Sequence, residues 1–189
     1  MTTVVVVQKD GKICIAADTL ARYGYQLEPA ENIRNSDKIV TVGDTFLAPT
    51  GPASAQLILR SYFADPENVA DFSGVDAIFE TMRQMHGTLK DEYFLNPKED
   101  DEQAFESTQM SCLVANSTGI YGVYSLRSVQ EYLKFYSFGS GSEYALGALH
   151  ALYEEPLDAE TIAVRSVEAA SKLDSATGAP VTWRTLDVE

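Results

Sequence analysis

Residues 3–18 read TVVVVQKDGKICIAAD, and this stretch decides the fold of the chain. Two β-branched and apolar runs flank Asp10-Gly11, a dipeptide that strongly indicates a two-residue turn between antiparallel strands. The pattern therefore predicts a hairpin whose strands are Thr3–Gln8 and Ile13–Ala17. Counting outward from the turn pairs Lys9 with Lys12, Val7 with Cys14, Val5 with Ala16 and Thr3 with Asp18.

This register places the amino end of the chain near a carboxylate. Directly opposed residues of an antiparallel pair have Cβ atoms about 4.5–5.5 Å apart. Because Asp18 ends an otherwise apolar strand and stands opposite Thr3, we expect the amino terminus to lie beside the Asp18 side chain.

The rest of the chain is predicted to form strands and helices in blocks. Turn residues and apolar periodicity predict further strands at 38–42, 46–49, 110–115, 120–124, 131–136 and 181–186. They predict helices at 53–63, from a cap at Ser73 to about Leu89, at 143–152, and from a cap at Asp158 to about Leu173. Segments 19–37 and 95–108 are expected to be loops. Because strands and helices do not alternate, the order indicates an α+β fold with layered antiparallel sheets and argues against a doubly wound nucleotide-binding fold.

Length and composition exclude several classes of protein. At about 150 residues per domain, 189 residues correspond to roughly one domain with a sizeable core. The 28 acidic and 14 basic residues give a net charge of −14, which argues against nucleic acid or an anionic membrane surface as a partner. No apolar run approaches about 18 residues, and the start has no basic region and too short an apolar run for a signal peptide. Two cysteines cannot form a disulfide framework, so we expect a cytoplasmic protein.

The second residue, Thr2, carries possible nucleophilic chemistry. Thr2 is small, so an aminopeptidase can remove Met1 and leave a free α-amino group and a hydroxyl on one residue. A hydroxyl is a weak nucleophile without an adjacent base, and an N-terminal amine can be that base. Its reference pKa is about 7.7–8.0. A nearby lysine would lower this pKa, and a carboxylate such as Asp18 would hold the lysine charged and oriented.

Several motifs in fixed order resemble one known family. The segments Thr2–Val6 and Ile15–Asp18 look like the start of a proteasome β-type subunit. The resemblance continues at Asp37–Val40, Ala48–Gly51, Phe138–Ser142 and Asp174–Gly178. Each motif is weak alone, but together they span nearly the whole chain in the family's order. The short length and the single residue before Thr2 look more like bacterial HslV-type subunits and the betaproteobacterial proteasome homologue.

The resemblance implies a role for each matching residue. Thr2 matches the nucleophile whose own amine is the base, and Asp18 and Lys38 match the ion pair that sets the protonation of that amine. Gly51 matches the glycine whose backbone N–H forms the oxyanion hole. The outer group that hydrogen-bonds around the amine is matched by Ser140, Asp174 and Thr177; the last is often serine in the family.

Two features of the resemblance concern binding. Pro49 lies near the position that forms the bottom of the pocket for the substrate residue before the cleaved bond. A proline at this position is unusual in the family, so the resemblance does not imply a cleavage preference. HslV-type subunits also bind a monovalent cation through backbone carbonyls near Ser171, Asp174 and Thr177. We predict no cofactor and no metal for this chain.

The fold and activity that the resemblance implies are specific. It implies a four-layer αββα sandwich of the N-terminal-nucleophile hydrolase type, with residues 1–189 as a single proteasome β-type domain. It also implies a threonine-type endopeptidase that cuts unfolded polypeptides inside two stacked rings of six or seven subunits. An ATP-dependent unfoldase is a further candidate partner.

Each of these residues also has a simpler interpretation. Asp18 is compatible with a cap or turn, Lys38 with a solvated strand edge, and Ser140 with the start of a helix. Residues 174–178 are compatible with a helix end at which Gly178 adopts the left-handed conformation. Alternative functions are an inactive ring-forming subunit that retains Met1, an amidase for small amides, and an acidic binding module.

The remaining candidate residues are interpreted as structural. Cys14 and Cys112 lie in apolar strands and are expected in the core. His86 and His150 lack metal-ligand spacing. The charged run 98–102 is expected to be a solvated loop. The aromatic set is expected in the sheet core and in subunit contacts; it comprises Tyr121, Tyr124, Tyr132, Phe135, Tyr136 and Phe138.

Overall fold

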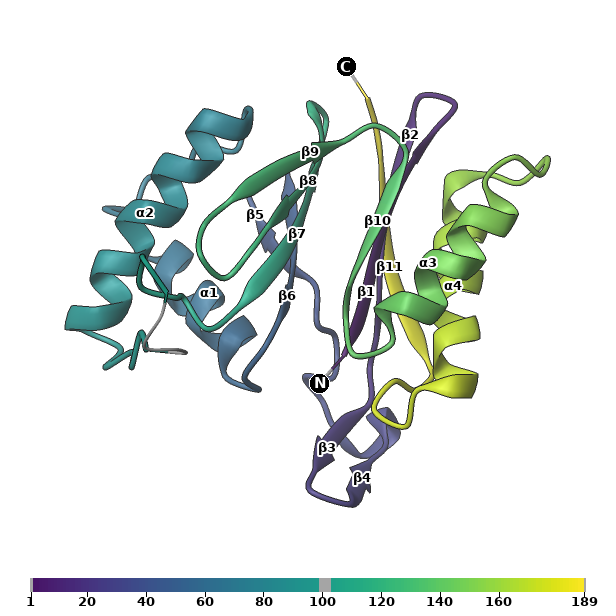
Figure 1. Ribbon diagram of the computed structural model, residues 1–189, viewed down its shortest axis with the longest axis horizontal. Coiled ribbons are helices and arrows are strands. Elements are labelled where there is room, and N and C mark those ends of the chain that lie inside the picture. The colour runs from purple at the N-terminus through teal and green to yellow at the C-terminus, as the bar shows by residue number, and fades with distance from the viewer. Residues whose placement is uncertain (1, 99–102, 189) are drawn as a thin grey trace.

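The computed structural model describes residues 2–98 and 103–188. Two antiparallel sheets face each other, and a pair of helices covers the outer face of each (Figure 1). This arrangement confirms the predicted α+β fold and the four-layer αββα sandwich. Met1 and most of the charged run predicted as a loop, residues 99–102, lie outside the described residues.

The first sheet contains the hairpin and the second contains the middle of the chain. In the described residues, the first sheet has the order β10 (Phe135–Gly139), β1 (Thr3–Lys9), β2 (Lys12–Asp18) and β11 (Val181–Asp187). The second has the order β5 (Val40–Val42), β6 (Thr45–Thr50), β7 (Ser111–Asn116), β8 (Gly119–Val123) and β9 (Val129–Tyr132).

The α-helices of the described residues form the two outer layers. The helices α1 (Ala55–Ala64) and α2 (Val75–Asp91) pack on the second sheet. The helices α3 (Ser142–Leu152) and α4 (Ala159–Leu173) pack on the first. The predicted cap at Asp158 is confirmed, because its carboxylate accepts a hydrogen bond of 2.8 Å from the Thr161 backbone N–H. The cap predicted at Ser73 is wrong, because α2 begins after Gly74 without a side-chain cap.

The valine run of β1 is apolar throughout because both of its faces are buried. Val4 and Val6 lie between the two sheets, whereas Val5 and Val7 pack against α3 and α4. A strand buried on both faces needs apolar residues at every position. The predicted register is confirmed for three pairs: Lys9–Lys12, Val7–Cys14 and Val5–Ala16. Asp10 and Gly11 have φ values of 51° and 74°, as a tight hairpin turn requires.

Two predicted elements differ from the structure. The strand predicted over 131–136 is wrong, because a bend at Leu133 and Lys134 carries the chain from β9 in one sheet to β10 in the other. The sequence does not show this bend, because aromatic residues typical of strands lie on both sides of it. The Tyr132 and Tyr136 rings stack between the two sheets, with their centroids 4.2 Å apart. The predicted loop 19–37 contains a small hairpin of β3 (Ala21–Tyr23) and β4 (Gln26–Glu28) and a short 3₁₀ helix, Ala30–Asn32.

The two cysteines are core residues, as predicted. Cys14 lies under α3 and α4, and Cys112 lies under α1 and α2. Burial raises the pKa of each thiol to about 12. Both are therefore neutral thiols at physiological pH and carry no nucleophilic chemistry.

Candidate active site

The buried carboxylate of Asp18 organises the amino end of the chain. It closes β2 and is fully buried. Its Oδ1 accepts hydrogen bonds from the Thr2 hydroxyl at 2.5 Å, the Thr3 backbone N–H at 3.0 Å and Lys38 Nζ at 2.8 Å. Its Oδ2 accepts from the backbone N–H groups of Leu20 and Gly178, at 3.2 and 3.1 Å. The hairpin thus brings the amino end to Asp18, as its register predicts.

Lys38 is a largely buried partner of Asp18, so its interpretation as a solvated edge residue is wrong. Its side chain is 15% exposed, and its ammonium group also donates to the Leu20 carbonyl oxygen at 2.8 Å. Burial lowers the pKa of Lys38 and outweighs the attraction of Asp18, which raises it. A cation and a hydroxyl therefore share one carboxylate oxygen.

The neighbouring Asp37 fixes the segment that carries Lys38. Its carboxylate accepts from Arg184 Nη2 at 2.6 Å and from the Thr182 hydroxyl at 3.1 Å, both on β11. It also accepts from the Ile39 backbone N–H at 3.0 Å. Sequence reasoning noted Asp37 only as part of a motif, because its partners lie at the far end of the chain.

A second hydrogen-bond network surrounds Thr2 from the helix side. The Asp174 Oδ2 atom accepts from the hydroxyls of Ser140 at 2.7 Å and Thr177 at 2.6 Å. Burial tends to raise the pKa of Asp174, but these hydrogen bonds, the Ala176 backbone N–H and the charge of Arg22 together outweigh it and hold the pKa below its usual value. The Ser140 backbone N–H donates to the Thr2 carbonyl oxygen at 2.9 Å. The structure therefore brings Ser140, Asp174 and Thr177 together beside Thr2.

Thr3 belongs to this network and was missed by sequence reasoning. Its hydroxyl lies 2.6 Å from the Thr177 hydroxyl and accepts from the Gly141 backbone N–H at 3.2 Å. The only signal in the sequence is a hydroxyl residue at the head of a valine run, which is too common to identify a site.

Thr2 opens into a pocket of about 410 Å³. Lys38, Pro49 and Gly51 also line this pocket. Gly51 has φ = +132°, and a Cβ atom there would lie 2.7 Å from the Gln109 carbonyl oxygen, so the position requires glycine. The pocket is large enough to receive part of a peptide chain.

Gly178, near the end of α4, differs from its alternative interpretation as a left-handed helix stop. Gly178 does not adopt the left-handed conformation, and its N–H binds Asp18 instead. The Ser171 hydroxyl donates to the Glu168 carbonyl oxygen of its own helix at 2.7 Å. In the described part of the chain, no three His, Cys, Asp or Glu side chains gather as a metal site would require.

Comparisons with known proteins identify the family. No family model matches the chain. The ATP-dependent protease subunit HslV of Bartonella quintana (strain Toulouse) is 29% identical over 191 residues, which covers 100% of this chain and 90% of that protein. The solved structure of Thiobacillus denitrificans BPH in complex with Epoxomicin is 44% identical, with a TM-score of 0.93 and 99% of each chain covered. The chain belongs to the HslV-type proteasome β-subunit family.

Membership of this family agrees with the fold. A crystal structure of eukaryotic HslV from Trypanosoma brucei has 18% identity and a TM-score of 0.69, and covers 98% of this chain. At that identity the likeness shows the shared fold alone. Within the described residues, this HslV-type subunit has no helix long and apolar enough to cross a membrane.

Proposed function

We propose that this chain is the threonine-type endopeptidase subunit of a proteasome-like particle. The observation that carries the proposal is the shared oxygen of Asp18, which binds the Thr2 hydroxyl and the Lys38 ammonium in a buried site. The same site opens into a pocket wide enough for a peptide. The nitrogen of Thr2 is an amide while Met1 is attached, so removal of Met1 creates the base.

The proposed reaction begins with attack by Thr2. Its Oγ atom forms a bond to the substrate carbonyl carbon while its α-amine accepts the hydroxyl proton. The tetrahedral intermediate collapses as the C–N bond breaks and the ammonium returns the proton to the leaving amine. Water then attacks the ester carbon while the amine accepts one of its protons. The bond between that carbon and Thr2 Oγ breaks, the ammonium returns the proton to Oγ, and the second product leaves as a carboxylic acid. The positive charge of Lys38 disfavours protonation of the amine and keeps it available as a base.

The other site residues support this reaction. The Gly51 N–H would stabilise the negative charge on the attacked carbonyl oxygen, because it lines the pocket beside Thr2. The network of Ser140, Asp174 and Thr177 would fix the Thr2 backbone and leave the amine one orientation. Pro49 lines the same pocket and would shape the preference for the residue before the cut bond.

The assembly is proposed from the family. We expect residues 1–189 to act as one proteasome β-type domain in a cytoplasmic double ring of six or seven subunits per ring. Unfolded polypeptides would be the substrates, and an ATP-dependent unfoldase is a candidate partner. In support, the Bartonella quintana relative is named as a subunit of an ATP-dependent protease.

Intact-mass measurement with a peptide epoxyketone tests the chemistry. We expect the purified chain to lack Met1 and to gain the mass of one inhibitor, whereas Thr2→Ala should gain none and should not cut peptides. Thr50→Ala, which changes another threonine of the same pocket, should still be labelled. Retention of Met1, or labelling of Thr2→Ala, would contradict the proposal. Native mass spectrometry of the particle tests the ring, and a stable monomer would exclude it.

A further inference from the structure

The proposed oxyanion residue, Gly51, rests directly on the backbone of another segment. Gly51 follows Thr50, whose pairing with Ser111 is the last between β6 and β7. A Cβ atom on Gly51 would lie 2.7 Å from the Gln109 carbonyl oxygen and 3.2 Å from Met110 Cα. The peptide that carries the Gly51 N–H is therefore positioned by whatever fixes Gln109.

Gln109 has an unusual backbone conformation for its residue type. Its φ is +59°, in the left-handed region that residues other than glycine, asparagine and aspartate rarely adopt. Two residues with positive φ, Gly51 and Gln109, thus lie against each other just beyond the end of the β6–β7 ladder. Unusual backbone conformations that the surrounding structure enforces are often associated with functional sites.

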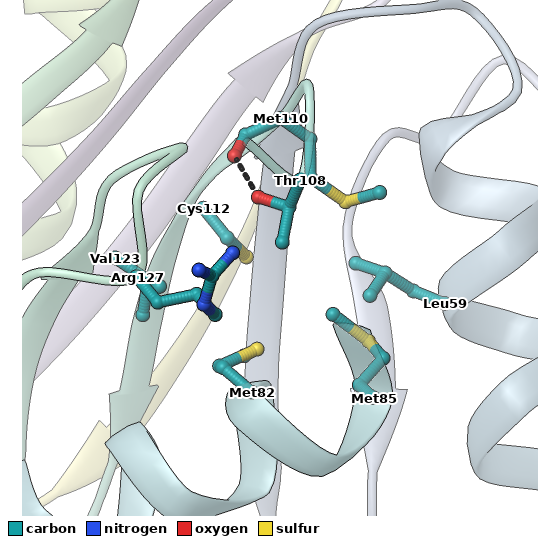
Figure 2. A pocket seen from close by; sticks show the side chains of 8 residues that line it. All are labelled: Leu59, Met82, Met85, Thr108, Met110, Cys112, Val123 and Arg127. Carbon is teal, nitrogen blue, oxygen red and sulfur yellow. Dashed lines mark hydrogen bonds between the residues drawn. The ribbon is translucent and has the colours of Figure 1, made fainter. Parts of the chain in front are cut away.

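Neighbouring residues enforce this conformation through hydrogen bonds. The Gln109 N–H donates to the Ser107 hydroxyl at 2.9 Å. The Thr108 N–H and hydroxyl both donate to the Ser125 carbonyl oxygen, at 2.8 and 2.9 Å. The Thr108 hydroxyl also lies 3.1 Å from the Met110 carbonyl oxygen, as Figure 2 shows. Ser107 and Thr108 are buried, so these hydrogen bonds are shielded from water.

Side chains pack closely behind this segment. A cavity of about 10 Å³, roughly the space of one water molecule, lies behind it. Figure 2 shows the side chains that line this cavity, where Thr108 and Met110 face residues of α1, α2 and β7. The cavity is lined by Leu59, Met82, Met85, Thr108, Met110, Cys112, Val123 and Arg127. Because little free volume remains on this side, Thr108 and Met110 cannot turn toward the core without displacing its side chains, although the segment also borders a pocket of about 410 Å³.

We propose that Gln109 is a positioning residue for the Gly51 N–H, acting through its left-handed backbone. This inference rests on the proposed function, in which that N–H stabilises the oxyanion. Such a donor must lie about 2.7–3.1 Å from the developing charge, and misplacement by about 1 Å can cost on the order of 10²-fold in rate. A change of the Gln109 φ would move the Gln109 carbonyl group, which lies against Gly51. It would therefore slow the chemical step more than it weakens substrate binding.

Variants that differ in tolerance for positive φ test the inference. Gln109→Gly and Gln109→Asn accept the left-handed region and should keep kcat within about twofold of the wild type. Gln109→Val, whose β-branched side chain disfavours it, should lower kcat at least about tenfold with KM nearly unchanged. The inhibition constant of a peptide aldehyde, whose adduct places an oxyanion near Gly51, should rise in parallel with the loss of kcat.

Asp10→Val is the matched control. Asp10 also has positive φ, 51°, but lies in the turn at the other end of the hairpin from Thr2. The Asp10→Val variant should have a lower thermal stability and an unchanged kcat. If Gln109→Val does not fold, Thr108→Val is tested in its place. Thr108→Val removes the hydroxyl that binds the Ser125 and Met110 carbonyl oxygens, and this variant should also lower kcat without changing KM.

The outcomes separate this inference from the proposed function. An unchanged kcat in a folded Gln109→Val variant overturns the inference. If Gln109→Val does not fold, an unchanged kcat in Thr108→Val overturns it. An equal loss in Gln109→Gly and Gln109→Val also overturns it, because the side chain and not the backbone would then matter. In both cases an inactive Thr2→Ala leaves the proposed function intact. Peptide hydrolysis by Thr2→Ala would instead overturn the proposed function.

Discussion

The hydroxyl of Thr2 donates a 2.5 Å hydrogen bond to Oδ1 of Asp18, although the two residues stand 16 positions apart. The β1–β2 hairpin brings them together, because its strands pair from Lys9–Lys12 back to Val4–Ala17. The same oxygen accepts from Lys38. Asp18 therefore holds the positive charge of Lys38 next to the proposed nucleophile. Removing the Lys38 ammonium group should change both the stability of the fold and the rate of catalysis, and the two effects can be measured separately.

Lys38→Met is predicted to abolish most of the activity and to destabilise the fold. The change leaves the buried Asp18 carboxylate without its cation, which costs about 3 kcal/mol or more in the free energy of unfolding. The α-amine would then face an unbalanced carboxylate, become harder to deprotonate, and lower kcat by about 10²-fold or more. Chemical denaturation and steady-state kinetics measure the two effects.

Lys12→Met is the control for this prediction. Lys12 pairs with Asp187 at the surface, where the two side chains are 58% and 77% exposed. Such a pair contributes about 0–1 kcal/mol to stability, so the variant should keep both its stability and its kcat. Equal losses in the two lysine variants would show that the effect at Lys38 is nonspecific.

Thr177→Val is predicted to reduce kcat about tenfold, with a smaller effect on KM. The Thr177 hydroxyl connects the Thr3 hydroxyl to the Asp174 carboxylate, and both groups lose a partner when it is removed. Thr177→Ser keeps the hydroxyl and should stay within about threefold of the wild type. Ser171→Ala, whose hydroxyl only binds its own helix, should be silent. A Thr177→Val variant as active as Ser171→Ala would show that the network does not orient the site.

The parts of the fold that local chemistry controls could be predicted from the sequence. The Asp10-Gly11 turn determines the hairpin register, and that register brings Thr2 to Asp18. The crossing at Leu133 and Lys134 could not be predicted, because aromatic residues suit strands in either sheet.

The site residues depend on contacts between distant segments. Lys38, Ser140 and Asp174 could be named only from the order of the motifs, since each has a common local explanation. Thr3 and Gln109 were missed because their roles depend on partners that the sequence does not place: Thr177 for one and Gly51 for the other.

Gly139→Ala is predicted to destabilise the fold and inactivate the site together. Gly139 has φ = +105°, and a Cβ atom there would lie 1.9 Å from the Thr2 carbonyl oxygen, so the backbone of the nucleophile must move. Gly147→Ala is the control, because Gly147 lies in α3 with nothing within 4 Å of its Cβ position. Alanine stabilises a helix relative to glycine by about 0.5–1 kcal/mol, so this variant should gain stability and keep its activity. Thermal denaturation and kcat test the pair; an active, stable Gly139→Ala would contradict the contact.

His86 on α2 is predicted to make stability depend on pH. Its side chain is 10% exposed, its Nε2 lies 3.1 Å from Glu106 Oε2, and its Nδ1 has no hydrogen-bond partner among the described residues. Burial lowers the pKa of His86 below 6.5 and outweighs the hydrogen bond to Glu106, while Arg127 and Lys90 also oppose the charged form.

The sign follows from the protons bound in each state. Between the lowered pKa of folded His86 and its ordinary value of 6.5, the unfolded chain binds more protons than the folded one. Stability must therefore fall as pH decreases through about 6.5, and the loss ends below the folded pKa. His86→Gln cannot titrate, so the drop in unfolding free energy between about pH 7.5 and 5.5 should be smaller in this variant than in the wild type. His150→Gln, which changes an exposed histidine on α3, should keep the wild-type drop. An equal drop in all three proteins would show that groups other than His86 cause the pH dependence.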